Sequence, residues 1–106
     1  MKFETLPLFD KQFKKLAKKY NFIKKDLSSF VEDFDSTHKQ AIFIKNNIYK
    51  IRLQNTNKNK GKSAGYRIYY YVKMDDIVYL ITIYDKSEIE MINENVVMDA
   101  IKDIKI

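Results

Sequence analysis

Apolar side chains in the first third of the chain recur every three or four residues, the spacing that places them on one face of a helix. Two such stripes occur, one before and one after Asn21: Phe9, Phe13, Leu16 and Tyr20, then Ile23, Leu27, Phe30, Val31 and Phe34. Pro7 suits the first turn of a helix, because that turn needs no N–H from it. Cruder alternation over residues 2–6 indicates a short strand. The sequence therefore predicts a strand followed by a helical hairpin.

From Ala41 onward the pattern changes to the alternation that is typical of strands. A short apolar run at residues 41–44 is followed by a turn signal at Asn46 and Asn47, and residues 48–53 and 66–73 then alternate. Residues 77–84 are apolar on both faces, which indicates a central strand. Strict alternation predicts two faces for this strand: Ile77, Tyr79, Ile81 and Ile83 on one, Val78, Leu80 and Thr82 on the other.

Polar segments separate these strands and precede a last helix. Residues 54–63 contain no apolar side chain and are expected to form a surface loop, and residues 74–76 are expected to form a short turn. A connector over residues 87–93 ends in Asn93, a plausible helix cap, before a final amphipathic stripe of Val97, Ile101 and Ile104. The order strand, two helices, three strands, helix predicts an α+β fold.

Alternation along the predicted strands also brings cations together. Lys50 and Arg52 share one face of the strand over residues 48–53, and Arg67 begins the next strand behind a basic loop flanked by glycines. Lys86 follows the last strand directly. Exposed ion pairs contribute only about 0–1 kcal/mol to stability, so converging cations are better explained by an anionic ligand.

Composition narrows the classes of function. A chain of 106 residues suits a single domain over residues 1–106, and the net charge of +6 favours anionic partners such as nucleic acid. The absence of cysteine excludes disulfides and thiolate metal sites. No apolar run approaches the roughly 20 residues that span a bilayer, and the apolar stretch near the N-terminus is too short for a signal peptide, so no membrane partner and a cytoplasmic location are expected.

Lysine and arginine are used very unequally in this basic chain. There are eighteen lysines but only two arginines, Arg52 and Arg67. A lysine-rich composition leaves arginine where a planar, bidentate and permanently charged donor is needed. The two arginines are therefore the first candidates for contact with phosphate.

Several features of the sequence are each compatible with two interpretations. The lysines of the first helix form either a nucleic-acid tract or a solvated face: Lys11, Lys14, Lys15, Lys18 and Lys19. His38, the only histidine, suits a surface or capping role at the end of the second helix as well as a general base. Tyrosines on strands commonly pack, and that interpretation stays open for Tyr69, Tyr70 and Tyr71.

Two runs of residues carry a resemblance to a known family. They are GKSAGYRIYY, from Gly61 to Tyr70, and LITIYDKSE, from Leu80 to Glu88. Both resemble the C-terminal half of the RelE/ParE superfamily of toxins from type II toxin–antitoxin systems, closest to the HigB-like, RelE-type branch. The initial strand and helical hairpin fit the same family, so the resemblance covers essentially the whole chain.

The resemblance implies a fold, an activity and partners. The fold is microbial-RNase-like, a small twisted antiparallel sheet with the N-terminal helical hairpin on one face and a C-terminal helix. The activity is that of an mRNA interferase, a ribosome-dependent endoribonuclease that cleaves messenger RNA in the A site, inhibits translation and arrests growth. The partners are the ribosome, mRNA and a cognate antitoxin, usually encoded beside the toxin and often DNA-binding.

The resemblance also assigns roles to individual residues. Arg67 matches a strand arginine that clamps phosphate and stabilises the transition state, and Lys86 matches a basic residue that acts as acid or stabiliser. Lys50 and Arg52 match basic residues of the preceding strand. Cleavage through the 2′-hydroxyl needs a base, an acid and positive charge, so no metal or cofactor is expected. We expect further RNA contacts from the loop and the strand after it: Lys60, Lys62, Ser63 and Tyr69.

One departure from the family and two other functions stay open. Some RelE-type toxins carry a catalytic tyrosine after the last strand, whereas Tyr84 stands before Lys86 here. Tyr84 is a candidate for proton transfer, for stacking on a base or for packing. A ParE-like inhibitor of DNA gyrase would act through the helical hairpin, and retention of Arg52, Arg67 and Lys86 argues against it. An inactive relative that binds only antitoxin or nucleic acid is the third possibility.

Overall fold

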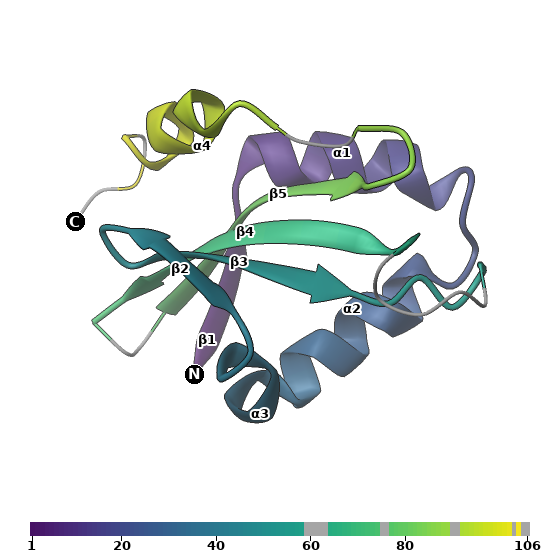
Figure 1. Ribbon diagram of the computed structural model, residues 1–106, viewed down its shortest axis with the longest axis horizontal. Coiled ribbons are helices and arrows are strands. Elements are labelled where there is room, and N and C mark those ends of the chain that lie inside the picture. The colour runs from purple at the N-terminus through teal and green to yellow at the C-terminus, as the bar shows by residue number, and fades with distance from the viewer. Residues whose placement is uncertain (59–63, 75–76, 90–91, 103, 105–106) are drawn as a thin grey trace.

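The computed structural model describes residues 1–58, 64–74, 77–89, 92–102 and 104 of the chain. It contains five strands and four helices in an α+β arrangement (Figure 1). The strands are β1 (Lys2–Thr5), β2 (Ile42–Lys45), β3 (Ile48–Leu53), β4 (Tyr66–Lys73) and β5 (Ile77–Asp85). The helices are α1 (Pro7–Ala17), α2 (Ile23–Glu32), α3 (Phe34–His38) and α4 (Glu94–Ile101). The radius of gyration, 12.9 Å, is what a compact chain of this length has.

The five strands form one sheet in the order β1-β5-β4-β3-β2. Strands β2 to β5 pair antiparallel, but β1 pairs parallel with β5, with Phe3 opposite Val78. The expectation of an entirely antiparallel sheet is therefore wrong at this edge. A short strand alternates in the same way whichever direction its neighbour runs, so its sequence carries no signal for the parallel pairing.

Helices cover the two faces of the sheet unequally. One face packs against α1, α2 and α3 through a buried cluster: Phe9, Leu16, Tyr20, Ile23, Phe30, Phe34, Ile51, Leu53, Tyr66, Ile68, Tyr70, Val78, Leu80 and Ile83. The other face packs against α4 through a second, smaller cluster: Leu6, Ile48, Tyr69, Tyr71, Ile81, Tyr84, Val97 and Ile104. Figure 1 shows α4 above one end of the sheet only.

The helices follow the predicted stripes with one break. The second predicted helix divides at Asp33, whose backbone leaves the helical region, so α3 is separate from α2. Asn93 caps α4 as expected, because its side chain accepts a hydrogen bond of 2.9 Å from the Asn95 backbone N–H. Within the described part of the chain, no helix has the length and apolar character needed to cross a membrane.

Strand β5 contains a bulge that sequence alternation did not predict. Tyr69 pairs with Thr82 whereas Tyr70 pairs with Leu80, so β5 has one extra residue here. The side-chain Oε1 of Gln12 in α1 accepts hydrogen bonds from the Thr82 hydroxyl (2.5 Å) and from the Ile83 backbone N–H (3.0 Å). The bulge reverses the alternation.

Beyond the bulge, the side chains of β5 therefore lie on the opposite sheet faces from those that strict alternation predicts. Ile83 joins Val78 and Leu80 in the larger cluster, whereas strict alternation placed Ile83 on the opposite face from them. Tyr84 correspondingly moves to the other face, opposite Arg67 of β4. The bulge therefore determines which aromatic ring lies beside Arg67.

Gly65 allows two backbone segments to approach each other where β4 begins. A Cβ atom on this residue would lie 2.1 Å from the Leu53 carbonyl oxygen and 3.0 Å from the Asn55 backbone nitrogen. Its own carbonyl accepts a hydrogen bond of 3.2 Å from the Lys86 backbone N–H. The glycine is therefore required by close packing against the end of β3.

We predict that Gly65→Ala destabilises the fold by about 1–3 kcal/mol, because backbone atoms cannot give way as a flexible side chain does. Urea denaturation followed by circular dichroism measures the effect. Ser28→Ala, at an exposed position of α2, is the control and should change stability by less than about 0.5 kcal/mol. A Gly65→Ala variant as stable as the control would contradict this role.

Candidate anion-binding site

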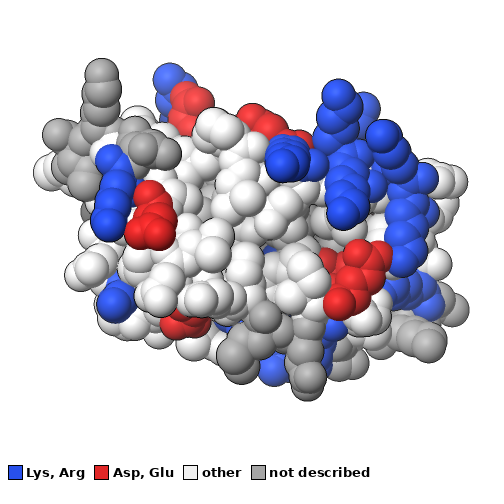
Figure 2. Space-filling view, turned by 90° about the horizontal axis from the view of Figure 1, so that it is seen from above, with Lys and Arg blue, Asp and Glu red and all other residues white. Residues whose placement is uncertain are grey.

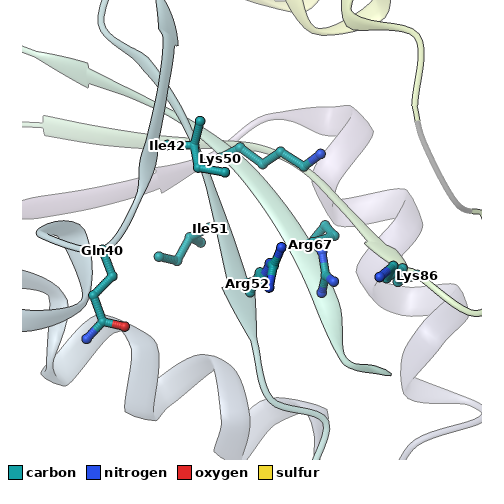
Figure 3. Close-up of a pocket in the computed structure, with 7 residues that line it drawn as sticks. All are labelled: Gln40, Ile42, Lys50, Ile51, Arg52, Arg67 and Lys86. Carbon is teal, nitrogen blue, oxygen red and sulfur yellow. The ribbon is translucent and has the colours of Figure 1, made fainter. Parts of the chain in front are cut away.

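A cavity of about 420 Å³ opens beside the strands β3 and β4. Seven residues line it, and Figure 3 shows them as sticks: Gln40, Ile42, Lys50, Ile51, Arg52, Arg67 and Lys86. The structure thus brings together the four cations that the sequence predicted, from β3, from β4 and from the residue after β5. Among the residues that the structure describes, none of those lining the cavity is Asp or Glu, so the cavity suits an anion.

The cavity lies where β2 begins. Ile42, the first residue of β2, pairs with Lys50 of β3. Ile51 and Arg52 of β3 extend beyond this pair. Arg52 then has a strand neighbour only on the β4 side, where it faces Arg67. The short edge strand therefore leaves the cationic part of β3 open.

Arg52 and Arg67 occupy directly opposite positions of the β3–β4 ladder. Like charges opposite each other destabilise a sheet, typically by up to about 1 kcal/mol. Arg52 is exposed, but Arg67 is only 4% exposed, and its Nη1 donates to the Tyr66 carbonyl at 3.1 Å. Burial and, next, the charge of Arg52 lower the pKa of Arg67. A bound anion would relieve this repulsion.

Lys50 lies over a buried tyrosine. Its Nζ is 5.5 Å from the centre of the Tyr69 ring, a cation–π distance, and the Tyr69 hydroxyl donates to Glu94 Oε2 at 3.0 Å. Burial raises the pKa of Tyr69, so the phenol stays protonated at neutral pH. Tyr69 has no exposed surface and offers no ring face to RNA. The buried Tyr69 ring therefore supports the Lys50 side chain, whose ammonium lies over it.

Packing accounts for the other tyrosines of the predicted site as well. Tyr70 and Tyr71 are buried, which confirms the packing interpretation of these rings. Tyr84 is 3% exposed and does not line the cavity, although its position is directly opposite Arg67. Burial raises the pKa of Tyr84, and the Arg67 charge opposes that effect. The buried Tyr84 ring is poorly placed to stack on a base.

Asp85 fixes the chain immediately before Lys86. The carboxylate is buried, accepts from the Lys58 ammonium at 2.7 Å and from the Ser87 hydroxyl at 2.7 Å, and also accepts from the Tyr20 hydroxyl. Burial opposes ionisation, but these donors together hold the pKa of Asp85 at about 2. The ion pair links the loop after β3 to the end of β5, and so places Lys86 at the cavity.

His38 lies outside the cavity, in an aromatic cluster. Its Nδ1 is 2.6 Å from the Tyr70 hydroxyl, and its ring stacks on Phe34 with centroids 5.1 Å apart. The Tyr49 ring meets it edge-on at 4.6 Å. These contacts favour a structural role over that of a general base.

Three of the lining residues were not predicted from the sequence. Gln40, Ile42 and Ile51 became part of the site because β2 begins only at Ile42, and alternation carries no signal for that. Lys60, Lys62 and Ser63, predicted to contact RNA, lie outside the described residues. Arg67, Lys86, Arg52 and Lys50 are the predicted residues that meet at one cavity.

The lysines of α1, and the two lysines just after it, do not line this cavity. Lys11, Lys14, Lys15, Lys18 and Lys19 are all exposed, and Lys19 pairs with Glu88 at 2.5 Å. Figure 2 shows blue side chains gathered at the end of the molecule where α1 lies in Figure 1. Both a solvated face and a nucleic-acid tract are compatible with this arrangement.

No protein-family model matches the chain, and no curated protein sequence is significantly similar to it. Among the described residues, no group of three or more His, Cys, Asp or Glu side chains is arranged to hold a metal ion.

We predict that Asp85→Asn lowers stability at pH 7 by at least about 2 kcal/mol, the equivalent of the pKa difference between 3.8 unfolded and about 2 folded. Because the folded pKa is the lower one, the contribution is present above about pH 4 and is lost as pH falls toward 2. Urea denaturation at several pH values tests this. Asp99→Asn, at an exposed carboxylate, is the control. A pH-independent difference between Asp85→Asn and the unmodified chain would exclude the ionised role.

We also predict that Arg52→Gln raises stability at low ionic strength by up to about 1 kcal/mol, because it removes the repulsion on Arg67. Phosphate should raise the Tm of the unmodified protein and have a smaller effect on this variant. Thermal denaturation with and without phosphate measures both effects. Lys39→Gln, an exposed cation that does not line the cavity, should respond to phosphate as the unmodified protein does. An equal phosphate response in all three proteins would show that the cavity does not bind it.

Proposed function

We propose that this protein is the toxin of a type II toxin–antitoxin system, a RelE-type, HigB-like endoribonuclease that cleaves messenger RNA on the ribosome. The observation that carries the proposal is the convergence of Arg52, Arg67, Lys50 and Lys86 on one cavity, whose described lining residues include no carboxylate. Stability does not explain this cluster, because two of its members face each other across a ladder and one is almost fully buried. The binding and cleavage of a phosphodiester do explain it.

The arginines suit the phosphate. Each guanidinium offers several N–H donors in a plane and keeps its charge at any working pH, so the pair can bind the two non-bridging oxygens of one phosphodiester. Attack by the 2′-hydroxyl adds negative charge to the phosphorus centre, and preorganised cations stabilise that charge more than the ground state. Arg67, held by burial and by the Tyr66 carbonyl, needs little reorganisation to do this.

The two lysines suit proton transfer. Arginine does not lose its proton in proteins, and Tyr84 is buried and its pKa raised, so Lys50 and Lys86 are the titratable groups left among the described residues that line the cavity. We assign one to take the proton of the 2′-hydroxyl and the other to protonate the 5′ leaving oxygen. Figure 3 shows Lys86 at one edge of the cavity and the Lys50 side chain extending from β3.

The arrangement of elements supports the proposal. A RelE-like fold places an N-terminal helical hairpin on one sheet face, and α1 and α2 share one buried cluster on the face opposite α4. The proposed activity brings its own partners: ribosome-bound mRNA as substrate, a cognate antitoxin that holds the toxin inactive, and a cytoplasmic location. A gyrase inhibitor of the ParE type would leave the cationic cavity without a role.

Primer extension on a defined messenger RNA in a reconstituted translation system tests the proposal. We expect discrete cuts within codons when translating ribosomes are present, and none when ribosomes are omitted. Intact messenger in both samples, from a protein that nevertheless arrests growth, would overturn the nuclease and favour gyrase or another protein target.

Variants of the arginines connect that activity to the cavity. We predict that Arg67→Ala and Arg52→Ala each reduce cleavage by roughly 10²-fold or more, the usual effect of losing a group that stabilises the transition state. Arg67→Ala should also relieve growth arrest while it still binds antitoxin and gives a folded circular-dichroism spectrum. Lys39→Ala is the matched control and should keep full toxicity. A folded, well-expressed Arg67→Ala variant that still arrests growth would contradict the assignment.

A further inference from the structure

The cavity has two halves of different chemistry. Figure 3 shows the guanidinium groups and Lys86 toward one side, and the uncharged residues Gln40, Ile42 and Ile51 toward the other. We propose that the uncharged half binds the base of the nucleotide whose phosphate the cationic half holds, and that Gln40 is the residue that discriminates between bases. This inference rests on the proposed RNA substrate.

The size of the cavity suits a whole nucleotide. Its volume of about 420 Å³ falls within the range of roughly 300–1,000 Å³ that is typical of small-molecule sites. Four cations are more than one phosphate needs. A site for phosphate alone would also not need the uncharged part of the lining. A nucleotide matches both halves, since its phosphate is anionic and its base is flat and largely apolar on its faces.

Ile42 provides an apolar wall. It is 54% exposed, belongs to neither buried cluster and sits opposite Lys50 at the start of β2. Its neighbour Phe43 packs on Tyr49 with ring centroids 5.4 Å apart and does not line the cavity. An exposed aliphatic side chain beside four cations is explained by a ligand that presents an apolar surface there.

Of the described residues that line the cavity, Gln40 is the one that is both uncharged and able to hydrogen-bond through its side chain. Its amide donates and accepts at once, which matches the paired donors and acceptors along a base edge. Lysine and arginine only donate, so they attract the phosphates of all nucleotides alike. Discrimination between bases therefore falls to Gln40.

The chain around Gln40 is already held in place. The Gln40 backbone N–H donates to the Thr37 carbonyl at 3.0 Å, and the Ala41 N–H donates to the His38 carbonyl at 3.1 Å. The His38 side chain is fixed in turn by its contacts with Phe34 and the Tyr70 hydroxyl. A side chain on a preformed turn loses less freedom when it binds, which favours selectivity.

Direct binding measurements test the inference without ribosomes. Isothermal titration calorimetry at low salt compares inorganic phosphate, ribose 5-phosphate and the four ribonucleoside 5′-monophosphates. We expect the nucleotides to bind more tightly than ribose 5-phosphate, with about a fivefold or larger spread among the four bases, the lower end of what one amide–base pairing supplies.

Two variants distinguish a specific role of the Gln40 side chain in base preference from a general effect of substitution. Gln40→Ala should remove the spread among the bases and leave the affinity for inorganic phosphate unchanged, because the cations are intact. Gln54→Ala changes an exposed glutamine that does not line the cavity and should keep the spread. Circular dichroism confirms that both variants are folded.

The inference is overturned if nucleotides bind no more tightly than ribose 5-phosphate, if no base is preferred, or if the preference survives Gln40→Ala. These outcomes are distinct from failure of the proposed function. A preference that depends on Gln40, in a protein that cuts no messenger, would support the base site and reject the nuclease. Absence of any phosphate binding would reject both.

Discussion

Strand β4 is buried on both faces, and the rest of the fold is built against it. Tyr66, Ile68 and Tyr70 pack beneath α1, α2 and α3, whereas Tyr69 and Tyr71 lie in the cluster covered by α4. Aromatic rings of this size contribute much of the apolar area that a small domain can bury. Because β4 pairs with β3 on one side and β5 on the other, any side chain on it has a position fixed by both neighbours.

Arg67 lies on this buried strand, and its position there determines where the candidate site forms. Its guanidinium is largely removed from water, and burial and the charge of Arg52 opposite it in the ladder both lower the pKa of Arg67. The buried tyrosines around it form the packed sheet that holds this side chain in place. The same rigidity keeps the cations converged without a ligand, which is the condition for strong electrostatic stabilisation of a transition state.

Alternation is a local property, so the sequence predicted that Lys50 and Arg52 share one face of β3. The register that places Arg67 opposite Arg52 was not predicted and comes from the pairing of β3 with β4. The prediction failed at the β5 bulge, where Gln12, far away in the chain, holds Thr82 and Ile83 and turns Tyr84 toward Arg67. It failed again at β1, where direction depends on the partner strand.

The sequence by itself determined the α+β class, the strand faces away from the bulge, and the identity of the four converging cations. These properties depend on spacing between neighbouring residues, which secondary structure converts directly into geometry. The sequence predicted three strands after the helices, whereas the structure describes four, because the apolar run at residues 41–44 contributes to the edge strand β2. Only the tertiary structure decided that Tyr69 and Tyr84 are buried, that Asp85 fixes the segment before Lys86, and that Gln40 and Ile42 complete the cavity. Those features depend on contacts between segments far apart in the chain, and on where β2 begins against β3, which no local pattern encodes.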